Sequence, residues 1–141
     1  MTPFEELIRQ LGEKLGTVLH VDPHQSCRLE FADNVIVQID LDGSADRLLL
    51  GATLGNLTPG SYRENLLKQA LIVNGLHAGR SGILAYSEKN DQLVLFSYLS
   101  LGTTTRDFLF EFLKNFVGHA FVWQEAIKRG EVPDVQIEAK S

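Results

Sequence analysis

The chain has a single cysteine, Cys27, among its 141 residues. One cysteine cannot form an internal disulfide, which fits a reducing compartment. Basic residues are also few, because 13 Lys and Arg stand against 18 Asp and Glu, for a net charge of −5. A negative field of this kind repels phosphate backbones and anionic lipid, and no local cluster of Lys and Arg opposes it. This charge balance argues against a nucleic-acid-binding protein.

Long apolar segments are absent as well. The longest apolar runs, such as Leu48–Leu50 and Leu71–Val73, fall far short of the roughly 20 residues that span a bilayer. The first six residues are acidic and lack the basic-then-apolar order of a signal peptide. We therefore expect a cytoplasmic protein without membrane insertion.

Metal-ligating patterns are sparse. The segment 20–24 contains His20, Asp22 and His24 and is predicted to be a loop. A catalytic zinc needs three protein ligands with supporting partners, and no Cys-x-x-Cys or His-Glu-x-x-His element completes a set. We interpret this segment as a polar loop, and a metal site built on it is a minor alternative.

Nucleophilic or acid–base catalysis finds equally little support. Cys27 alternates with polar residues on the same side as Leu29 and Phe31, which is typical of a core position. His77 and His119 lie at or in apolar helices, where a structural histidine is commoner than a general base. The sequence therefore favours a protein that is not an enzyme.

Hydrophobic periodicity predicts three helices and five strands. Thr2 and Glu5 form a capping box with Pro at the first helical position, and apolar residues then recur at helical spacing. Alternating strands, turn residues and further helical stretches follow. The predicted helices cover residues 3–15, 61–75 and 107–129, and the predicted strands cover residues 27–31, 35–41, 47–54, 82–87 and 92–99.

The resulting order, α-β-β-β-α-β-β-α, predicts an α+β fold. Hairpin-length connections inside each group of strands favour a twisted antiparallel sheet with three helices. No linker or repeat divides the chain, so residues 1–130 are expected to form one domain and residues 131–141 a flexible C-terminal tail.

Apolar residues exceed what such a domain can easily cover. The strands at 47–54 and 92–99 are apolar on both faces, and the second helix carries more than one apolar stripe. Apolar surface left uncovered on a folded protein usually marks an oligomer interface or a site for another chain. The alternative is that the core of the monomer absorbs all of it.

One stretch of sequence resembles a known family. The second helix carries Leu66-Leu67-Lys68-Gln69-Ala70-Leu71-Ile72-Val73-Asn74 and leads through Gly79-Arg80-Ser81-Gly82 into two apolar strands. This pattern of leucines, Asn, glycine-rich turn and paired strands resembles the class I chaperones of type III secretion systems, the CesT/SycE-like group. With length, acidity and element order, the resemblance covers residues 2–128.

The resemblance implies a cytoplasmic homodimer without nucleotide, metal or other cofactor. Such a chaperone binds the N-terminal region of secreted effector proteins and keeps them soluble and competent for export. It implies dimerisation through the second helix and the following strand, at Leu66, Leu67, Ala70, Leu71, Val73, Ile83 and Ala85. It implies effector binding by the first helix and first strands, at Phe4, Ile8, Leu29, Phe31, Val35 and Val37.

Two other functions compete with this one. The first is a secretion-linked regulatory module that binds proteins in order to control expression. The second is a small metal-dependent enzyme built on His20, Asp22 and His24.

Overall fold

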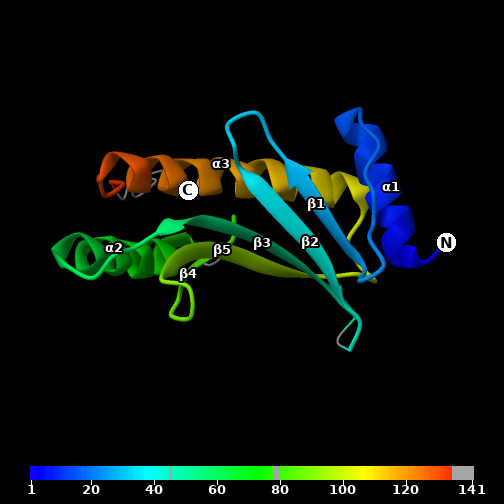
Figure 1. The fold of residues 1–141 in the computed structure, drawn as a ribbon. Helices are drawn as coiled ribbons and strands as arrows, with labels where there is room; N and C mark the ends of the chain where they lie inside the picture. The colour runs from blue at the N-terminus through cyan, green and yellow to red at the C-terminus, as the bar shows by residue number, and fades with distance from the viewer. Residues whose placement is uncertain (45, 78–79, 135–141) are drawn as a thin grey trace.

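The computed structural model describes residues 1–44, 46–77 and 80–134 (Figure 1). The predicted order of helices and strands is confirmed. The elements are α1 (Pro3–Leu15), β1 (Ser26–Glu30), β2 (Ile36–Asp42), β3 (Arg47–Asn56), α2 (Ser61–His77), β4 (Ile83–Ser87), β5 (Gln92–Ser100) and α3 (Arg106–Arg129).

The five strands form one antiparallel sheet in the order β1-β2-β3-β5-β4. Its centre is the long β3–β5 pair, in which Arg47 lies opposite Ser100 and Asn56 opposite Gln92. β1 and β4 are the two edges. Each group of consecutive strands pairs with its neighbours through short turns, as the hairpin pattern predicted.

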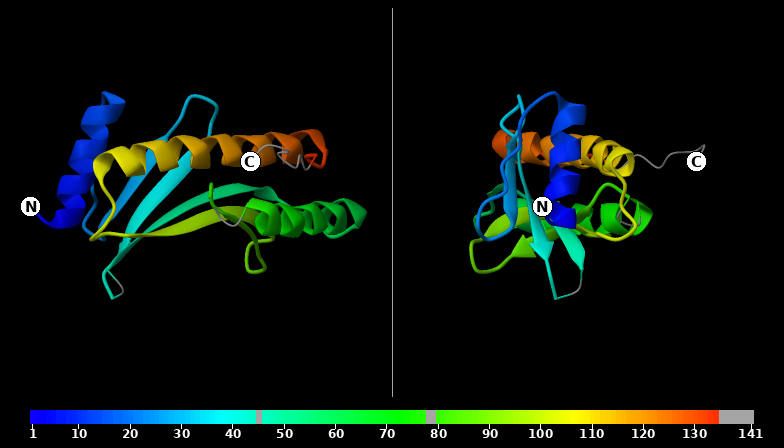
Figure 2. Two further views of the ribbon diagram at one scale, coloured as in Figure 1. Left: turned by 180° about the vertical axis from the view of Figure 1, so that it is seen from behind. Right: turned by 90° about the vertical axis from the view of Figure 1, so that its right-hand side faces the viewer.

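α1 and α3 cover one face of this sheet (Figure 2). α3 runs along the sheet, α1 lies across the β1–β2 end, and α2 lies against β4 at the other end. Alternate residues of β3 point into the core below α3 because side chains of a strand alternate between faces. The core residues that come from β3 and α3 are Leu48, Leu50, Ala52, Leu54, Leu109, Leu113, Phe116, Ala120 and Trp123.

The ends of α1 and α3 follow their local sequence. The Thr2 side chain accepts a hydrogen bond from the Glu5 backbone N–H at 3.1 Å, and the Glu5 carboxylate accepts one from the Thr2 N–H at 2.8 Å. Thr105 caps α3 in the same way by accepting from the Phe108 N–H at 3.1 Å. Both helices end at a glycine in the left-handed region, α3 at Gly130.

α2 extends beyond the end near Gly75 that the sequence predicted, and runs to His77. Gly75 does not adopt a positive φ, so it is not a left-handed cap. The Asn74 side chain does not cap the helix either, because its amide bonds to β4. In the described part of the chain, no helix has the length and apolar character that crossing a membrane requires.

Candidate interaction surfaces

α2 has two apolar sides, and only one of them packs on the protein itself. Leu66, Ala70 and Val73 are buried against the sheet and α3. The outer face of α2, which we define as Leu71, Ile72 and Leu76, is exposed, with Leu71 at 72%. Exposure of a contiguous apolar face on a folded protein is typical of a site that another chain covers.

An apolar hollow of about 180 Å³ adjoins this face, between α2 and β4. Leu71 belongs both to the outer face and to the hollow, so the two form one surface. The hollow is lined by Leu67, Ala70, Leu71, Leu84, Ala85, Tyr86 and Leu93.

The seven residues predicted for dimerisation fall into two groups. Leu71 and Ile83 are exposed, and Leu67 and Ala85 are half-buried, so these four offer surface to a partner. The other three, Leu66, Ala70 and Val73, lie in the core of this chain. A role of any of the seven in dimerisation remains a prediction.

Asn74 closes the outer edge of β4. Its side-chain amide donates to the Leu84 carbonyl at 2.8 Å and accepts from the Leu84 N–H at 2.9 Å. In the antiparallel pair with β5, these Leu84 groups point away from the sheet. The amide therefore replaces the peptide group that a further strand would supply, and it fixes α2 against β4.

A second polar cluster holds the start of α2 to the β4–β5 turn. The Arg63 guanidinium donates to the Tyr86 hydroxyl at 2.9 Å, and that hydroxyl donates to the Asp91 carboxylate. Because the hydrogen bond to Asp91 stabilises the protonated hydroxyl, the pKa of Tyr86 is raised above its usual range. The cluster therefore fixes α2 relative to β4, and the apolar hollow lies between these two elements.

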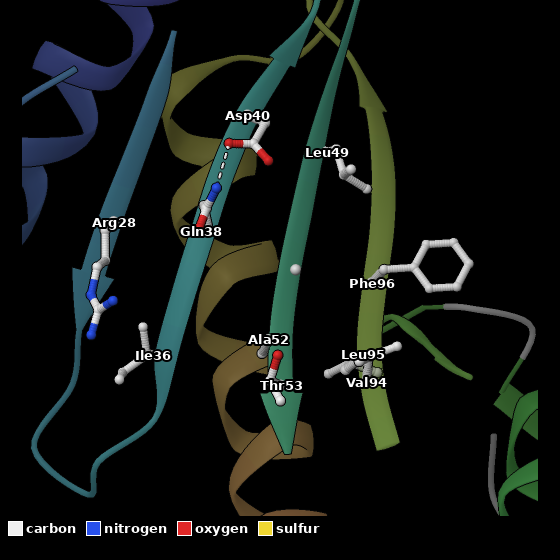
Figure 3. Close-up of a pocket in the computed structure, with 11 residues that line it drawn as sticks. Arg28, Ile36, Gln38, Asp40, Leu49, Ala52, Thr53, Val94, Leu95 and Phe96 are labelled. Carbon is white, nitrogen blue, oxygen red and sulfur yellow. Dashed lines mark hydrogen bonds between the residues drawn. The ribbon is translucent and has the colours of Figure 1, made fainter. Parts of the chain in front are cut away.

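The face of the sheet opposite α3 is not covered by a helix, and it is hollowed to about 530 Å³ (Figure 3). We call this surface the open face. Its floor and walls come from four strands. The lining residues are Arg28, Ile36, Gln38, Asp40, Leu49, Gly51, Ala52, Thr53, Val94, Leu95 and Phe96.

The two halves of the open face differ in character. On β1 and β2 the side chains are mostly polar, with Arg28, Gln38 and Asp40 beside Ile36. On β3 and β5 they are mostly apolar, including Leu49, Val94 and Phe96. An occupant of the hollow would therefore meet an apolar side and a polar side.

Five of the six residues predicted to bind an effector lie in the core. Phe4, Ile8, Leu29, Val35 and Val37 are each at most 4% exposed, and Phe31 is half-buried against them. In this conformation the five present no surface to a client. The same strands display Arg28, Ile36 and Gln38, which are not among the six predicted residues, on the open face. Contact of the six residues with a client stays a prediction.

The His-Asp-His segment is organised by its own aspartate. The Asp22 carboxylate accepts hydrogen bonds from the backbone N–H groups of His24 at 2.8 Å and Ser26 at 3.1 Å. Across residues 1–44, 46–77 and 80–134, no three His, Cys, Asp or Glu side chains form a group that could hold a metal ion.

Of the three residues that the sequence offered for catalysis, the side chain of His77 lies outside the described part of the structure, and Cys27 and His119 have structural surroundings. Cys27 is buried, and this burial raises the pKa of its thiol. His119 Nδ1 lies 3.2 Å from the Ser81 carbonyl, which joins α3 to the segment before β4.

Solved structures of secretion chaperones share this fold. The chain is similar to the HopA1-SchA chaperone–effector complex at a TM-score of 0.72 and 21% identity, over 88% of this chain and 94% of that one. For the ExsC-ExsE complex the TM-score is 0.69 at 20% identity, over 96% and 94% of the two chains. For the Yersinia pestis type III secretion chaperone SycH, solved with a fragment of YscM2, the TM-score is 0.65 at 17% identity, over 85% of this chain and 98% of that one.

The fold is thus one that type III secretion chaperones adopt. The model of the Tir chaperone protein (CesT) family matches residues 6–124, and the chain belongs to that family. The resemblance to the CesT/SycE-like group is therefore confirmed. The chain matches none of the curated proteins.

Proposed function

We propose that this protein is a class I type III secretion chaperone that binds the N-terminal region of secreted effectors as a cytoplasmic homodimer. It acts by binding and performs no catalysis. The observation that supports this function most is the family match over residues 6–124 together with two uncovered surfaces, the outer face of α2 and the open face. A chaperone of this kind needs one surface for itself and another for its client.

The outer face of α2 and the adjoining hollow are the proposed self-interface. Leu71 is among the most exposed large apolar residues, and it stands beside a hollow whose lining is almost entirely apolar. In a twofold dimer the same patch meets itself, so the Leu71 side chain of one subunit can enter the corresponding surface of the other. Fully desolvated apolar contacts of this kind carry most of the affinity of an interface.

The β1 edge is the proposed site where an extended client segment pairs with the sheet. At Ser26 the edge is already closed, because its carbonyl accepts from the Asp22 N–H at 2.9 Å and its N–H donates to the Asp22 carboxylate. The outward backbone groups of Arg28 and Glu30 bond to no backbone group in the described part of the chain. An added strand would satisfy these groups and gain main-chain affinity.

The two edges of the sheet thus have different roles in this proposal. Asn74 closes β4 at Leu84, whereas β1 stays open at Arg28 and Glu30. A client strand is therefore directed to β1 and away from the proposed self-interface. Ordering a disordered client costs free energy, which apolar contacts on the open face help to offset.

Affinity capture from the native cell tests the function. The tagged protein should retain a secreted protein, and a version of that client without its N-terminal region should not be retained. The same preparation should have a mass of about 31 kDa without client, twice the 15.7 kDa of one chain. Recovery of only cytoplasmic enzymes, or client binding that does not depend on the N-terminal region, would contradict the proposal.

A further inference from the structure

Gly51 lies in the middle of the central strand β3, at the floor of the open face. Gln38 of β2 is its partner on one side and Phe96 of β5 its partner on the other. Glycine weakens the interior of a strand because it has no side chain to pack and loses more backbone freedom on folding. Its presence at this position therefore needs a reason.

The fold itself supplies no reason. Gly51 is not among the glycines with positive φ, and a Cβ built on it would meet nothing within 4 Å. Gly55 and Gly82 differ, because both have positive φ and a Cβ there would approach a core side chain to 2.8 Å. A glycine in the interior of a strand often marks a bulge, a tight bend, or a place where a ligand or another backbone approaches closely. The register shift of β3 lies between Thr53 and Gly55 and leaves Gly51 in regular pairing, which favours a close approach.

We propose that Gly51 keeps a socket open in the sheet for one large apolar side chain of an amphipathic client helix. The inference rests on the proposed function and specifies which client segment the open face selects. Leu49 and Thr53 flank the socket along β3, and Val94 and Phe96 of β5 line the same hollow, the Phe96 ring on the side of β5 away from β3 (Figure 3). A side chain at position 51 would fill the space that the client needs.

The surroundings favour a helix over an extended segment on this face. The backbone groups of β3 are paired with β2 on one side and β5 on the other, so they offer nothing to a strand lying across them. A helix satisfies its own backbone groups and can lay an apolar stripe on side chains. An amphipathic helix would place its apolar stripe on the apolar half of the open face, on β3 and β5. Its polar side would then lie toward the polar half, on β1 and β2.

Asp40 determines the charge that the client helix should carry. Its carboxylate accepts from Gln38 Nε2 at 3.0 Å and from the Ser26 hydroxyl, and no cation in the described ranges forms an ion pair with it. Asp40 lies opposite Leu49, two residues along β3 from Gly51, which makes it a diagonal neighbour about 7 Å from the socket. Residues one helical turn apart have a comparable spacing of about 6 Å. The client helix should therefore carry Lys or Arg one turn from its apolar anchor.

Fluorescence anisotropy with three synthetic peptides tests the socket. The first probe is an amphipathic helix of about 18 residues with a central leucine and a lysine one turn away. The second has alanine for the central leucine, and the third has glutamate for the lysine. We expect the native dimer to bind the first probe about tenfold more tightly than the other two. Equal affinity for all three would overturn the proposal.

Variants at position 51 complete the test. Gly51→Val should weaken binding of the first probe about tenfold or more while the melting temperature stays equal or rises, because valine suits a strand better than glycine. Gly51→Ala should have an intermediate effect and decides the matter if the valine variant does not fold. Gly118→Ala is the matched control, since this glycine of α3 also has no atom within 4 Å of a built Cβ and lies away from the open face.

Two further outcomes separate this inference from the proposed function. If Gly51→Val binds the first probe as tightly as the native protein, the socket is wrong even when the protein still captures a secreted client. If Gly51→Val becomes a monomer, the open face contacts a second copy of this chain, and the client-helix proposal is overturned. Retention of probe binding by Leu71→Asp would place the probe on the open face instead of the outer face of α2, in support of the socket.

Discussion

The side chain of Asn74 on α2 forms two hydrogen bonds with the backbone of Leu84 on β4, at 2.8 and 2.9 Å. These bonds occupy both outward groups of an edge residue whose side chain is itself buried. Unpaired strand edges invite pairing with other chains. A single side chain thus holds a helix in place and protects an edge.

Replacing Asn74 with Ala should destabilise the protein by about 1–3 kcal/mol, because the buried Leu84 backbone groups lose their partners. Chemical denaturation measures this loss. Asn74→Asp can still accept from the Leu84 N–H but cannot donate to its carbonyl, so its stability should not exceed that of the native protein. Asn65→Ala, at an exposed position of the same helix, is the control and should change stability little. Equal stability of Asn74→Ala and the native protein would refute the structural role.

Replacing Leu71 with Asp should convert the dimer to a monomer, because it places a carboxylate at the centre of the proposed self-interface. Light scattering should then give a mass near 15.7 kDa in place of about twice that value. The monomer itself should stay folded, since Leu71 is 72% exposed within one chain. Val18→Asp, at a residue that is 77% exposed outside α2, is the matched control. A dimeric Leu71→Asp protein would exclude the outer face of α2 as the interface.

Replacing Arg28 with Pro should reduce client affinity by removing one outward N–H from the β1 edge. The pairing of β1 with β2 should survive, because the Arg28 N–H points away from β2 and proline is tolerated on edge strands. Arg28→Ala removes the charge but keeps the N–H, so it separates strand addition from electrostatics. Titration of both variants with the captured client measures the difference. Equal affinities of Arg28→Pro and Arg28→Ala would argue against strand addition at this edge.

Local sequence determined much of the fold but less of the binding surfaces. The α1 capping box at Thr2 and Glu5 and the alternation along β3 depend on neighbours in sequence, so both could be predicted. Which side of a strand faces a helix depends on the packing of distant elements. The family resemblance assigns Leu29 and Val37 to a client, and the fold places α1 and α3 over that face and buries both residues, so their contact with a client stays a prediction.

Two features of the surfaces have a signal in the sequence. Gly51 follows the apolar run Leu48–Leu50 in the interior of a predicted strand, which indicates a special requirement in the sheet. Asn74 sits in an apolar helix, where a polar side chain usually has a specific partner. Neither signal identifies the neighbouring residue. Asn74 meets Leu84, and Gly51 lies opposite Phe96, only in the tertiary fold.

Tyr86 should make stability depend on pH in the alkaline range. Its pKa is raised in the folded protein by the hydrogen bond to Asp91, so the protonated hydroxyl stabilises the fold. This contribution is fully present below the unfolded value of about 10 and is lost as the pH rises through the higher folded value. Tyr86→Phe removes the titrating hydroxyl. Denaturation at pH 8 and pH 11 should show a smaller alkaline loss of stability in Tyr86→Phe than in the native protein, and an equal loss would contradict this role.

Gly82, directly before β4, should be among the least replaceable residues of the chain. It has a φ of +104°, which side-chain-bearing residues rarely adopt, and a Cβ would lie 2.8 Å from Leu95 Cδ1 and 3.0 Å from Phe116 Cε2. Both neighbours are fully buried, so neither can move without disturbing the core under α3. Gly82→Ala should therefore destabilise the protein by about 2 kcal/mol or more, from strain and overpacking together. Gly118→Ala should leave stability unchanged or raise it, because its Cβ has open space on a helix. Thermal unfolding of the two variants compares them directly, and a Gly82→Ala protein as stable as the native one would show that Leu95 and Phe116 yield more easily than their packing implies.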